Sequence, residues 1–248
     1  MPFHVYGVTS EEVALPDGMT GLYDAPVERV VDDGLAALVG SCPDQPVARR
    51  AELMAHARVL EALVEQETVL PMQFGMTMPD EDAVRRDLLA AHHDHLLGLL
   101  ERLSGTVQLT VKAVYREEEA LREVLRRSPR LLRTRERLAS VPAAAAHFQQ
   151  AEFGQEIAAE VERMGHQDAA WVLDQLVPRS LAYEEGRHVS AYHLLNTAFL
   201  VEREARTAFD AAVTDVSERL QERCTVRYLG PQPPYSFVDL QAGDPAWA

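Results

Sequence analysis

Segments with a strand-like period alternate along this chain with segments of helical period, and their order constrains the fold more than any other sequence feature. A first strand is predicted over Phe3–Val8, a run rich in aromatic and β-branched residues. Val27–Val31 and Leu35–Val39 are predicted to form a hairpin, because Asp33-Gly34 between them supplies the positive φ of a tight turn. The chain therefore begins with a sheet.

Two amphipathic helices and two more strands follow. The first helix is expected from Ala48 to Gln66, and a strand is expected over Thr68–Phe74. The apolar positions of this helix, which predict one buried face, are Leu53, Ala57, Leu60 and Val64. A second helix begins at Pro79 with acidic residues that favour a helix N-terminus and ends at Gly105. Thr106–Tyr115 then alternates as a strand, so this half indicates a sheet covered by two helices.

The second half begins with charged, helical sequence, and this change places the predicted domain boundary after residue 116. A charged helical stretch over Arg116–Ala139, interrupted at Ser128-Pro129, precedes a long helix from Ala143 to about Leu176. Strands are then expected around Leu181–Ser190, Leu194–Val201 and Thr225–Leu229, with a helix over about Glu204–Glu222 before the last one. We therefore predict an α+β protein of two domains, 1–116 and 117–248.

The charge of the chain argues against nucleic acid as a partner. The formal net charge is −15, and such a surface repels a phosphate polyanion unless a local basic patch overcomes the field. Arginines are concentrated between Arg122 and Arg137, but glutamates interleave them. This pattern is typical of a solvated, salt-bridged helical face, and a nucleic-acid site there is the less favoured interpretation.

Cysteine usage and hydropathy predict a cytoplasmic protein with no membrane partner. Cys42 and Cys224 are far apart and no C-x-x-C occurs, which favours neither a disulfide scaffold nor a zinc knuckle. No window approaches the roughly 18 apolar residues of a membrane span, and the N-terminus lacks the pattern of a secretory leader.

The common catalytic and cofactor signatures are absent, so we expect neither an enzyme nor a bound cofactor. The sharpest candidate for chemistry is the pair His92 and His95, which share one helical face and could bind a transition metal with a third ligand. A polar helix face explains these histidines more simply. A small-molecule or metal-binding regulatory α+β protein is therefore the alternative function.

Two segments are harder to explain as ordinary turn and core. In Val69–Gly75, a proline inside an apolar strand removes one ladder hydrogen bond and predicts a sheet edge or a bulge. In Gly230–Val238, prolines favour an extended backbone that ends in two aromatic residues, which either cover the core or contact a partner. The predicted partner-binding residues are Leu70, Pro71, Phe74, Pro233, Pro234, Tyr235 and Phe237.

These two segments, together with Tyr6-Gly7-Val8 and Leu195–Val201, resemble the gas vesicle accessory protein family GvpF/GvpL. They occur in the same order over nearly the whole chain, and the Gly230–Val238 ending is the most specific. The resemblance implies a non-enzymatic assembly factor that binds the hydrophobic shell protein GvpA, as a chaperone or a nucleating component, and contacts other accessory proteins. It also implies a ferredoxin-like, helix-rich C-terminal domain. Met76 and Met78 depart from the pattern, where smaller or β-branched residues are expected.

Overall fold

The computed structural model describes residues 1–44, 46–187, 190 and 192–238, with the backbone alone at 143–146. Its contacts divide the described chain into two compact units. Unit 1 consists of Met1–Leu109, Leu200–Glu204 and the described residues from Gly230 onward, and unit 2 consists of Thr110–Phe199 and Ala205–Leu229. Unit 1 is thus assembled from three separate stretches, which no single sequence boundary captures. The division at residue 116 stays a prediction for independently folding domains.

The sheet of unit 1 has the strand order β2-β3-β1-β4, and β5 pairs with β1 next to the β4 pairing. Its strands are β1 (Phe3–Ser10), β2 (Val27–Asp32), β3 (Leu35–Ser41), β4 (Leu70–Pro71) and β5 (Thr77–Met78). Its helices are the 3-10 turn η1 (Leu22–Asp24), α1 (Arg50–Val64), α2 (Glu81–Ala83), the π-helix η2 (Val84–Ala90) and α3 (His93–Arg102). The predicted hairpin is confirmed, with Asp32 opposite Leu35 and Gly34 at φ 85°.

Both faces of this sheet are covered, which explains why β1 and β3 are buried almost throughout. Tyr6 and Leu38 pack with α1 in one core cluster. Val5, Ala37 and Val39 alternate to the other face and pack in a second cluster with leucines of η2 and α3. The predicted arrangement of a sheet with two covering helices is therefore confirmed for this unit, but the strand predicted over Thr106–Tyr115 belongs to the second sheet instead.

Three details differ from the sequence prediction. The strand expected over Thr68–Phe74 shrinks to the two residues of β4, although the Met72 N–H still donates to the Tyr6 carbonyl at 2.9 Å. The second helix is not continuous, since His92, at φ −120°, separates η2 from α3. Leu53, expected on the buried face of α1, is 44% exposed, whereas Leu60 and Val64 are buried.

The second sheet has the order β7-β8-β6-β9. Its strands are β6 (Thr106–Tyr115), β7 (Ala182–Glu185), β8 (His193–Glu202) and β9 (Cys224–Gln232). The accompanying helices are α4 (Glu117–Arg127), α5 (Pro129–Ala139), α6 (Ala143–Leu176), α7 (Arg206–Leu220) and the 3-10 turns η3 (Val177–Arg179) and η4 (Arg203–Ala205). Along the chain these elements follow the order β6, α6, β7, β8, α7 and β9. This order, combined with the spatial order β7-β8-β6-β9, is the ferredoxin-like topology, and α4 and α5 are added before α6.

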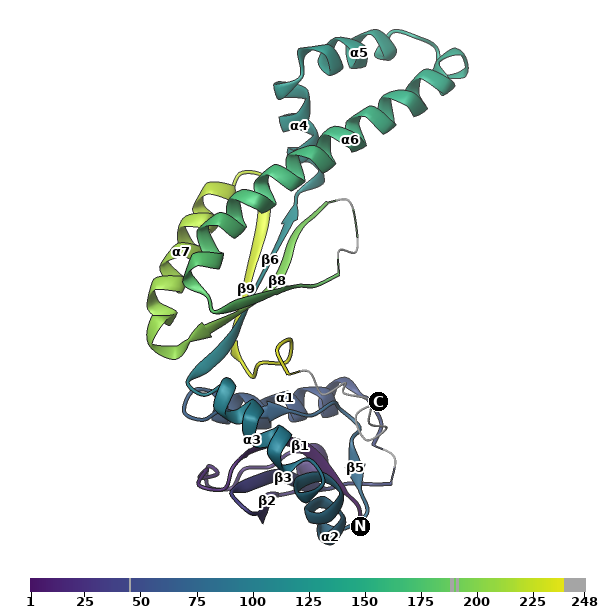
Figure 1. Cartoon of the computed structure of the whole chain (residues 1–248). Coiled ribbons are helices and arrows are strands. Elements are labelled where there is room, and N and C mark those ends of the chain that lie inside the picture. Colours follow the sequence, from purple (N-terminus) through teal and green to yellow (C-terminus); the bar gives the residue numbers. More distant parts are fainter. Residues whose placement is uncertain (45, 188–189, 191, 239–248) are drawn as a thin grey trace. The chain divides into compact units, whose positions relative to one another are not determined.

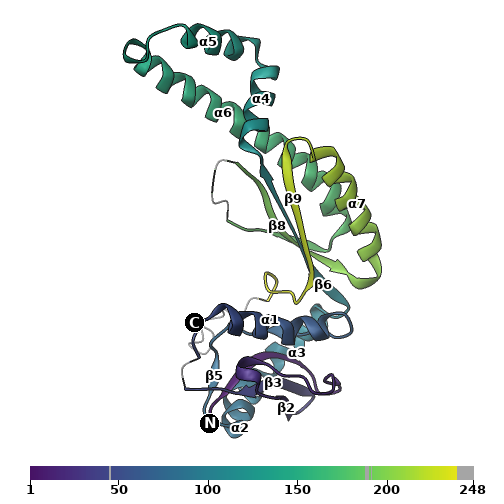
Figure 2. The ribbon, with the colours of Figure 1, turned by 180° about the vertical axis from the view of Figure 1, so that it is seen from behind.

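Helix α6 has two roles in unit 2. Its C-terminal half lies with α7 over one face of the second sheet, and its N-terminal half extends past the strands, where α4 and α5 lie beside it (Figures 1 and 2). The predicted break between α4 and α5 is confirmed, because Ser128 caps α5 by accepting from the Leu131 N–H. Interleaved glutamates pair with Arg122, Arg126 and Arg127, as the charge pattern predicts, and Arg130 pairs instead with Glu156 of α6. Two arginine partners lower the pKa of Glu123 to about 2.

Arg203 closes the C-terminal end of α1 within unit 1. Its Nε donates to the Val64 carbonyl at 3.1 Å and its Nη2 to the Glu67 carbonyl at 2.6 Å. Because these are charge-assisted bonds to carbonyls at a helix C-terminus, we expect Arg203→Ala to lower the free energy of unfolding by about 2 kcal/mol. Arg203→Lys keeps the charge without the two-pronged geometry and should lose about half as much. Urea unfolding measures both, and equal stability of the alanine variant and wild type would contradict the expectation.

Candidate partner-binding surface

The Leu70–Gly75 segment lies at the edge of the first sheet, as its proline predicts. β4 is the last strand of the order, and it pairs only through Gly7 with Pro71 and Val8 with Leu70. Leu70 and Pro71 are both buried. These two side chains therefore fill the core of the protein itself.

Phe74, at the end of this segment, belongs to a cluster of rings that the sequence analysis missed. Its ring centroid lies 5.5 Å from that of His4 and 5.9 Å from that of His56, and Tyr6 lies 4.8 Å from His4. The Tyr6 hydroxyl accepts from the Leu22 N–H at 2.8 Å, and burial raises the pKa of Tyr6 to about 12. The members come from β1, α1 and the segment after β4, so no spacing in the sequence signals the cluster.

Hydrogen bonds fix the protonation of the two buried histidines. His56 Nε2 lies 3.1 Å from the Met72 carbonyl, which only accepts, so this nitrogen carries the proton. Neutral His56 then accepts at Nδ1 from His4 Nε2, which is 2.8 Å away. Burial and then repulsion from His56 lower the pKa of His4 to about 3, and burial lowers the pKa of His56 to about 4. Both rings are neutral at physiological pH.

The proline-rich ending is a fixed turn. Its expected extended backbone continues only to Gln232, where β9 ends. The Phe237 N–H then donates to the Pro234 carbonyl at 2.9 Å, and the Ser236 N–H donates to Gln108 Oε1 at 2.8 Å. The turn is therefore tied to β6 by a side chain whose partner is 128 residues away in sequence.

The seven predicted partner-binding residues differ in exposure. Leu70, Pro71, Pro233 and Pro234 are buried, Phe74 and Phe237 are half-buried, and Tyr235 is 41% exposed. Phe237 packs against the core cluster that contains Leu70, so the structure brings the two segments together. Covering the core accounts for most of these side chains, and Tyr235 presents its ring at the surface. Their contact with a partner stays a prediction.

The described residues give little support to a metal or small-molecule site. No group of three or more His, Cys, Asp or Glu side chains among them is placed to hold a metal ion. His93, between the two predicted ligands His92 and His95, instead lies 2.9 Å from the Asp33 carbonyl. Burial raises the pKa of Cys42, and it raises the pKa of Cys224 to about 12, so neither thiol forms a reactive thiolate readily.

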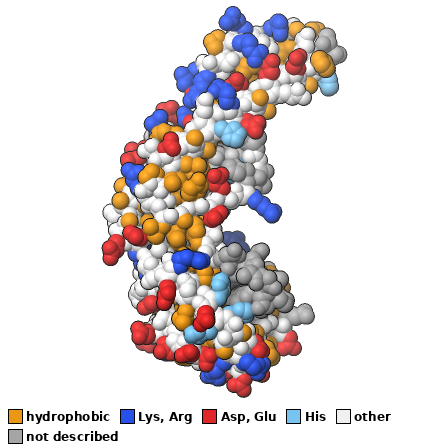
Figure 3. Space-filling model, in the orientation of Figure 1, with side chains coloured by type: hydrophobic (Ala, Val, Ile, Leu, Met, Phe, Trp, Pro, Cys, Tyr) orange, Lys and Arg blue, Asp and Glu red, His pale blue; other side chains and the backbone are white. Residues whose placement is uncertain are grey.

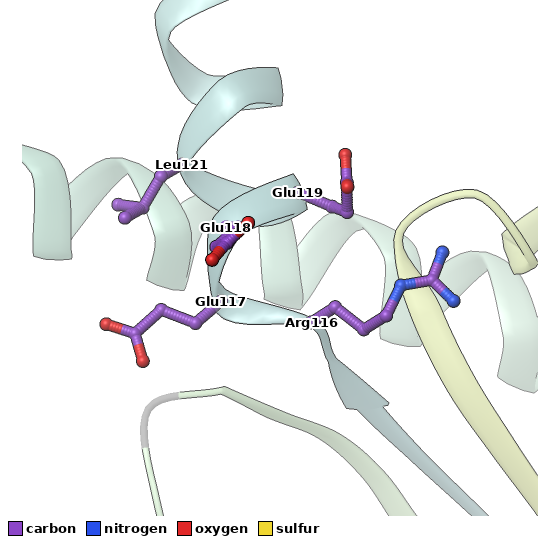
Figure 4. A pocket seen from close by; sticks show the side chains of 5 residues that line it. All are labelled: Arg116, Glu117, Glu118, Glu119 and Leu121. Carbon is purple, nitrogen blue, oxygen red and sulfur yellow. The ribbon is translucent and has the colours of Figure 1, made fainter.

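An open depression at the start of α4 is lined by Arg116, Glu117, Glu118, Glu119 and Leu121 (Figure 4). The side chains point in different directions, not toward one centre. Arg116 donates to the Gln221 carbonyl at 2.6 Å, and Glu118 and Glu119 pair with Arg122. These polar groups are engaged within the protein, so they do not form the convergent set that a small-molecule site needs.

Charge is unevenly distributed along the chain. Residues 1–109 contain 18 acidic side chains against 7 basic ones, which makes them the source of most of the net charge of −15. On the face shown in Figure 3, basic side chains instead gather over α4 and α5. Within the described part of the chain, no helix has the length and apolar character that crossing a bilayer requires.

Comparison with known proteins supports one family over the whole chain. The family model described as gas vesicle synthesis protein GvpL/GvpF matches residues 2–239. Gas vesicle protein F of Streptomyces sp. (strain CB03234) is 34% identical, covering 96% of this chain and 100% of the relative, and gas vesicle protein L of the same strain is 27% identical over 97% and 94%. The crystal structure of GvpF from Microcystis aeruginosa has a TM-score of 0.76 at 25% identity, covering 95% and 98% of the two chains. That of GvpF from Anabaena sp. PCC7120 has a TM-score of 0.82 at 22% identity, over 95% and 97%.

Proposed function

The chain belongs to the GvpL/GvpF family of gas vesicle synthesis proteins, and from this membership we propose that it binds the shell protein GvpA during vesicle assembly, without catalysis. Its role is that of a gas vesicle accessory protein. The observation that carries the proposal is the similarity in sequence over residues 2–239, matched by similarity in fold over 95% of the chain.

The physical need for such a protein follows from the vesicle wall. A wall that encloses gas must present apolar side chains to it, so its subunits carry surface that aggregates in water before they are incorporated. A partner that covers this surface and carries a net charge of −15 would keep the pair dispersed. We place this step in the cytoplasm, with other accessory proteins as further partners and with neither nucleic acid nor membrane among the proposed partners.

Tyr235 is the predicted contact residue that the surface makes available, so its removal tests the proposal. We expect Tyr235→Ala to weaken GvpA capture about tenfold in co-purification while leaving the unfolding transition unchanged, because its ring is 41% exposed. Phe237→Ala should lower stability instead, since its ring packs on the core. Tyr183→Ala, which removes a ring of 42% exposure from β7 in unit 2, is the matched control.

The outcomes separate the proposed roles. A wild-type protein that neither co-purifies with GvpA nor changes its solubility would disprove the binding proposal. Recovery of the protein in washed vesicles would favour a nucleating component that stays in the wall over a chaperone that leaves it.

A further inference from the structure

Helices α4 and α5 are additions to the ferredoxin-like topology of unit 2. They lie beside the part of α6 that extends past the strands, and their main contacts are with each other and with α6 (Figures 1 and 2). Folding two helices of 11 residues each costs conformational entropy. Because the second sheet is covered by α6 and α7 without them, their outer surface is a candidate for contact with another molecule.

Arginines crowd these two helices, and on the face shown in Figure 3 basic side chains gather over them. Residues 122–139 contain seven arginines and two glutamates. The arginines that pair with glutamates of α4 or α6 are Arg122, Arg126, Arg127 and Arg130. The arginines that pair with no carboxylate of the described part of the chain are Arg133, Arg135 and Arg137. All three are exposed, so the surplus of positive charge is local to α5.

Three arginines form a stripe along one side of α5. Arg130, Arg133 and Arg137 follow one another at intervals of three and four residues, and we define them as the α5 stripe. Glu136 is the one acidic residue of α5. It lies about 60° around the helix from Arg133, so it borders the stripe without interrupting it.

The helix beneath the stripe is held in place by the rest of unit 2. Leu131 and Leu138, on the opposite side of α5, are 0% and 6% exposed. Ser128 caps the first turn, and Arg130 is tied to Glu156 of α6 at 3.0 Å. A partner therefore meets arginines on a preformed helix, which reduces the ordering that binding requires.

We propose that the α5 stripe is a docking site for an acidic helix of a partner protein, with carboxylates at intervals of three and four residues. A guanidinium binds a carboxylate through two parallel hydrogen bonds, and this spacing lets neighbouring carboxylates meet Arg133 and Arg137 together. With 11 residues, α5 is about 16 Å long and matches three turns of such a helix. The site goes beyond the proposed GvpA contact at Tyr235, which belongs to the other unit.

An acidic helix fits this stripe better than a nucleic acid does. A polynucleotide continues past the stripe, where it meets the field of a chain with a net charge of −15. A helix of three turns is no longer than α5 itself. Charges farther away than about 8 Å are largely screened at physiological ionic strength, so the local surplus of arginine determines its binding.

Two synthetic peptides test the stripe directly. They share an alanine-rich helical sequence, and one has glutamates at three positions spaced by three and four residues where the other has glutamines. In fluorescence anisotropy, wild-type protein should bind the glutamate peptide at least about tenfold more tightly than the glutamine peptide. Arg133→Gln/Arg137→Gln should weaken binding of the glutamate peptide about tenfold, and circular dichroism should show an unchanged fold, because both side chains are exposed. Arg133→Lys/Arg137→Lys keeps the charge without the two-pronged geometry and should weaken it about threefold.

Arg49→Gln/Arg50→Gln is the matched control, since it removes two exposed arginines at the start of α1 and changes the net charge equally. It should bind the glutamate peptide as wild type does. Equal weakening by the two glutamine double variants would show that net charge decides binding, and it would overturn the stripe. Equal binding of the two peptides by wild type would overturn it as well. Tighter binding of a single-stranded oligonucleotide with the same number of charges would replace the acidic helix with a nucleic acid.

Discussion

Asp168→Ala is expected to lower the free energy of unfolding by about 3 kcal/mol. Asp168 lies in the C-terminal half of α6, and its carboxylate accepts from Arg223 at two positions, 2.7 and 3.1 Å away. The buried Tyr115 hydroxyl at the end of β6 also donates to it, at 2.5 Å. Alanine would leave the Arg223 guanidinium and the Tyr115 phenol without their partner inside unit 2. Removing one partner of such a network destabilises the folded protein by more than the intact ion pair stabilises it.

Two further variants separate this network from an ordinary loss of charge. Asp168→Asn keeps the shape but loses the negative charge, so it should lose less stability than alanine. Glu160→Ala removes the partner of Arg163 from an exposed ion pair on the same helix and should cost no more than about 0.5 kcal/mol. Chemical denaturation measures all three. Equal stability of Asp168→Ala and Glu160→Ala would show that the network does not hold α6 to the sheet.

Acidification is expected to destabilise the protein between about pH 6.5 and pH 4. His4 and His56 are 0% and 6% exposed, and their pKa values in the folded protein are lowered to about 3 and about 4 from 6.5. As the pH falls below 6.5, the unfolded chain binds protons at these positions and the folded protein does not. Stability is therefore full above about pH 7, falls by about 2 to 4 kcal/mol by pH 5, and levels off once the folded rings titrate.

The pH effect can be assigned to these rings. In NMR titrations the two buried imidazoles should keep constant chemical shifts from pH 8 to pH 5. The double variant His4→Leu/His56→Leu should show a flatter dependence of stability on pH over that range, whatever its absolute stability. His166→Gln, which removes a histidine with a 79% exposed side chain, should keep the wild-type profile. Titration of the His4 or His56 ring near pH 6.5 would contradict the expectation.

The buried histidines were beyond the reach of sequence reasoning for a definite reason. His4 precedes Tyr6 in a strand pattern and His56 occupies a helix position, and neither has a metal-ligand or catalytic spacing. Their hydrogen bond joins residues 52 apart in sequence. The run His92-His93-Asp94-His95 does offer two histidines on one helical face, although its histidines are not buried.

The exposure of the predicted partner-binding residues could not be predicted from the sequence either. The proline in Leu70–Gly75 and the prolines before Tyr235 mark both segments as unusual in the sequence itself, because proline restricts the backbone wherever it occurs. Exposure was not predictable, since it depends on which other segments cover a side chain. Four of the seven residues are buried, and Leu53, expected to be buried, is exposed.

The sequence by itself determined the order of elements, the hairpin at Asp33-Gly34, the span of α6 and the membership in the GvpL/GvpF family. These features depend on local chemistry: turn residues that permit a positive φ, caps, and apolar residues repeating at a fixed period. Only the tertiary structure decided which stretches form unit 1, which rings surround His4, which side chains donate hydrogen bonds to Asp168, and which side of α1 faces water. Those outcomes depend on contacts between residues far apart along the chain, and local sequence carries no record of such partners.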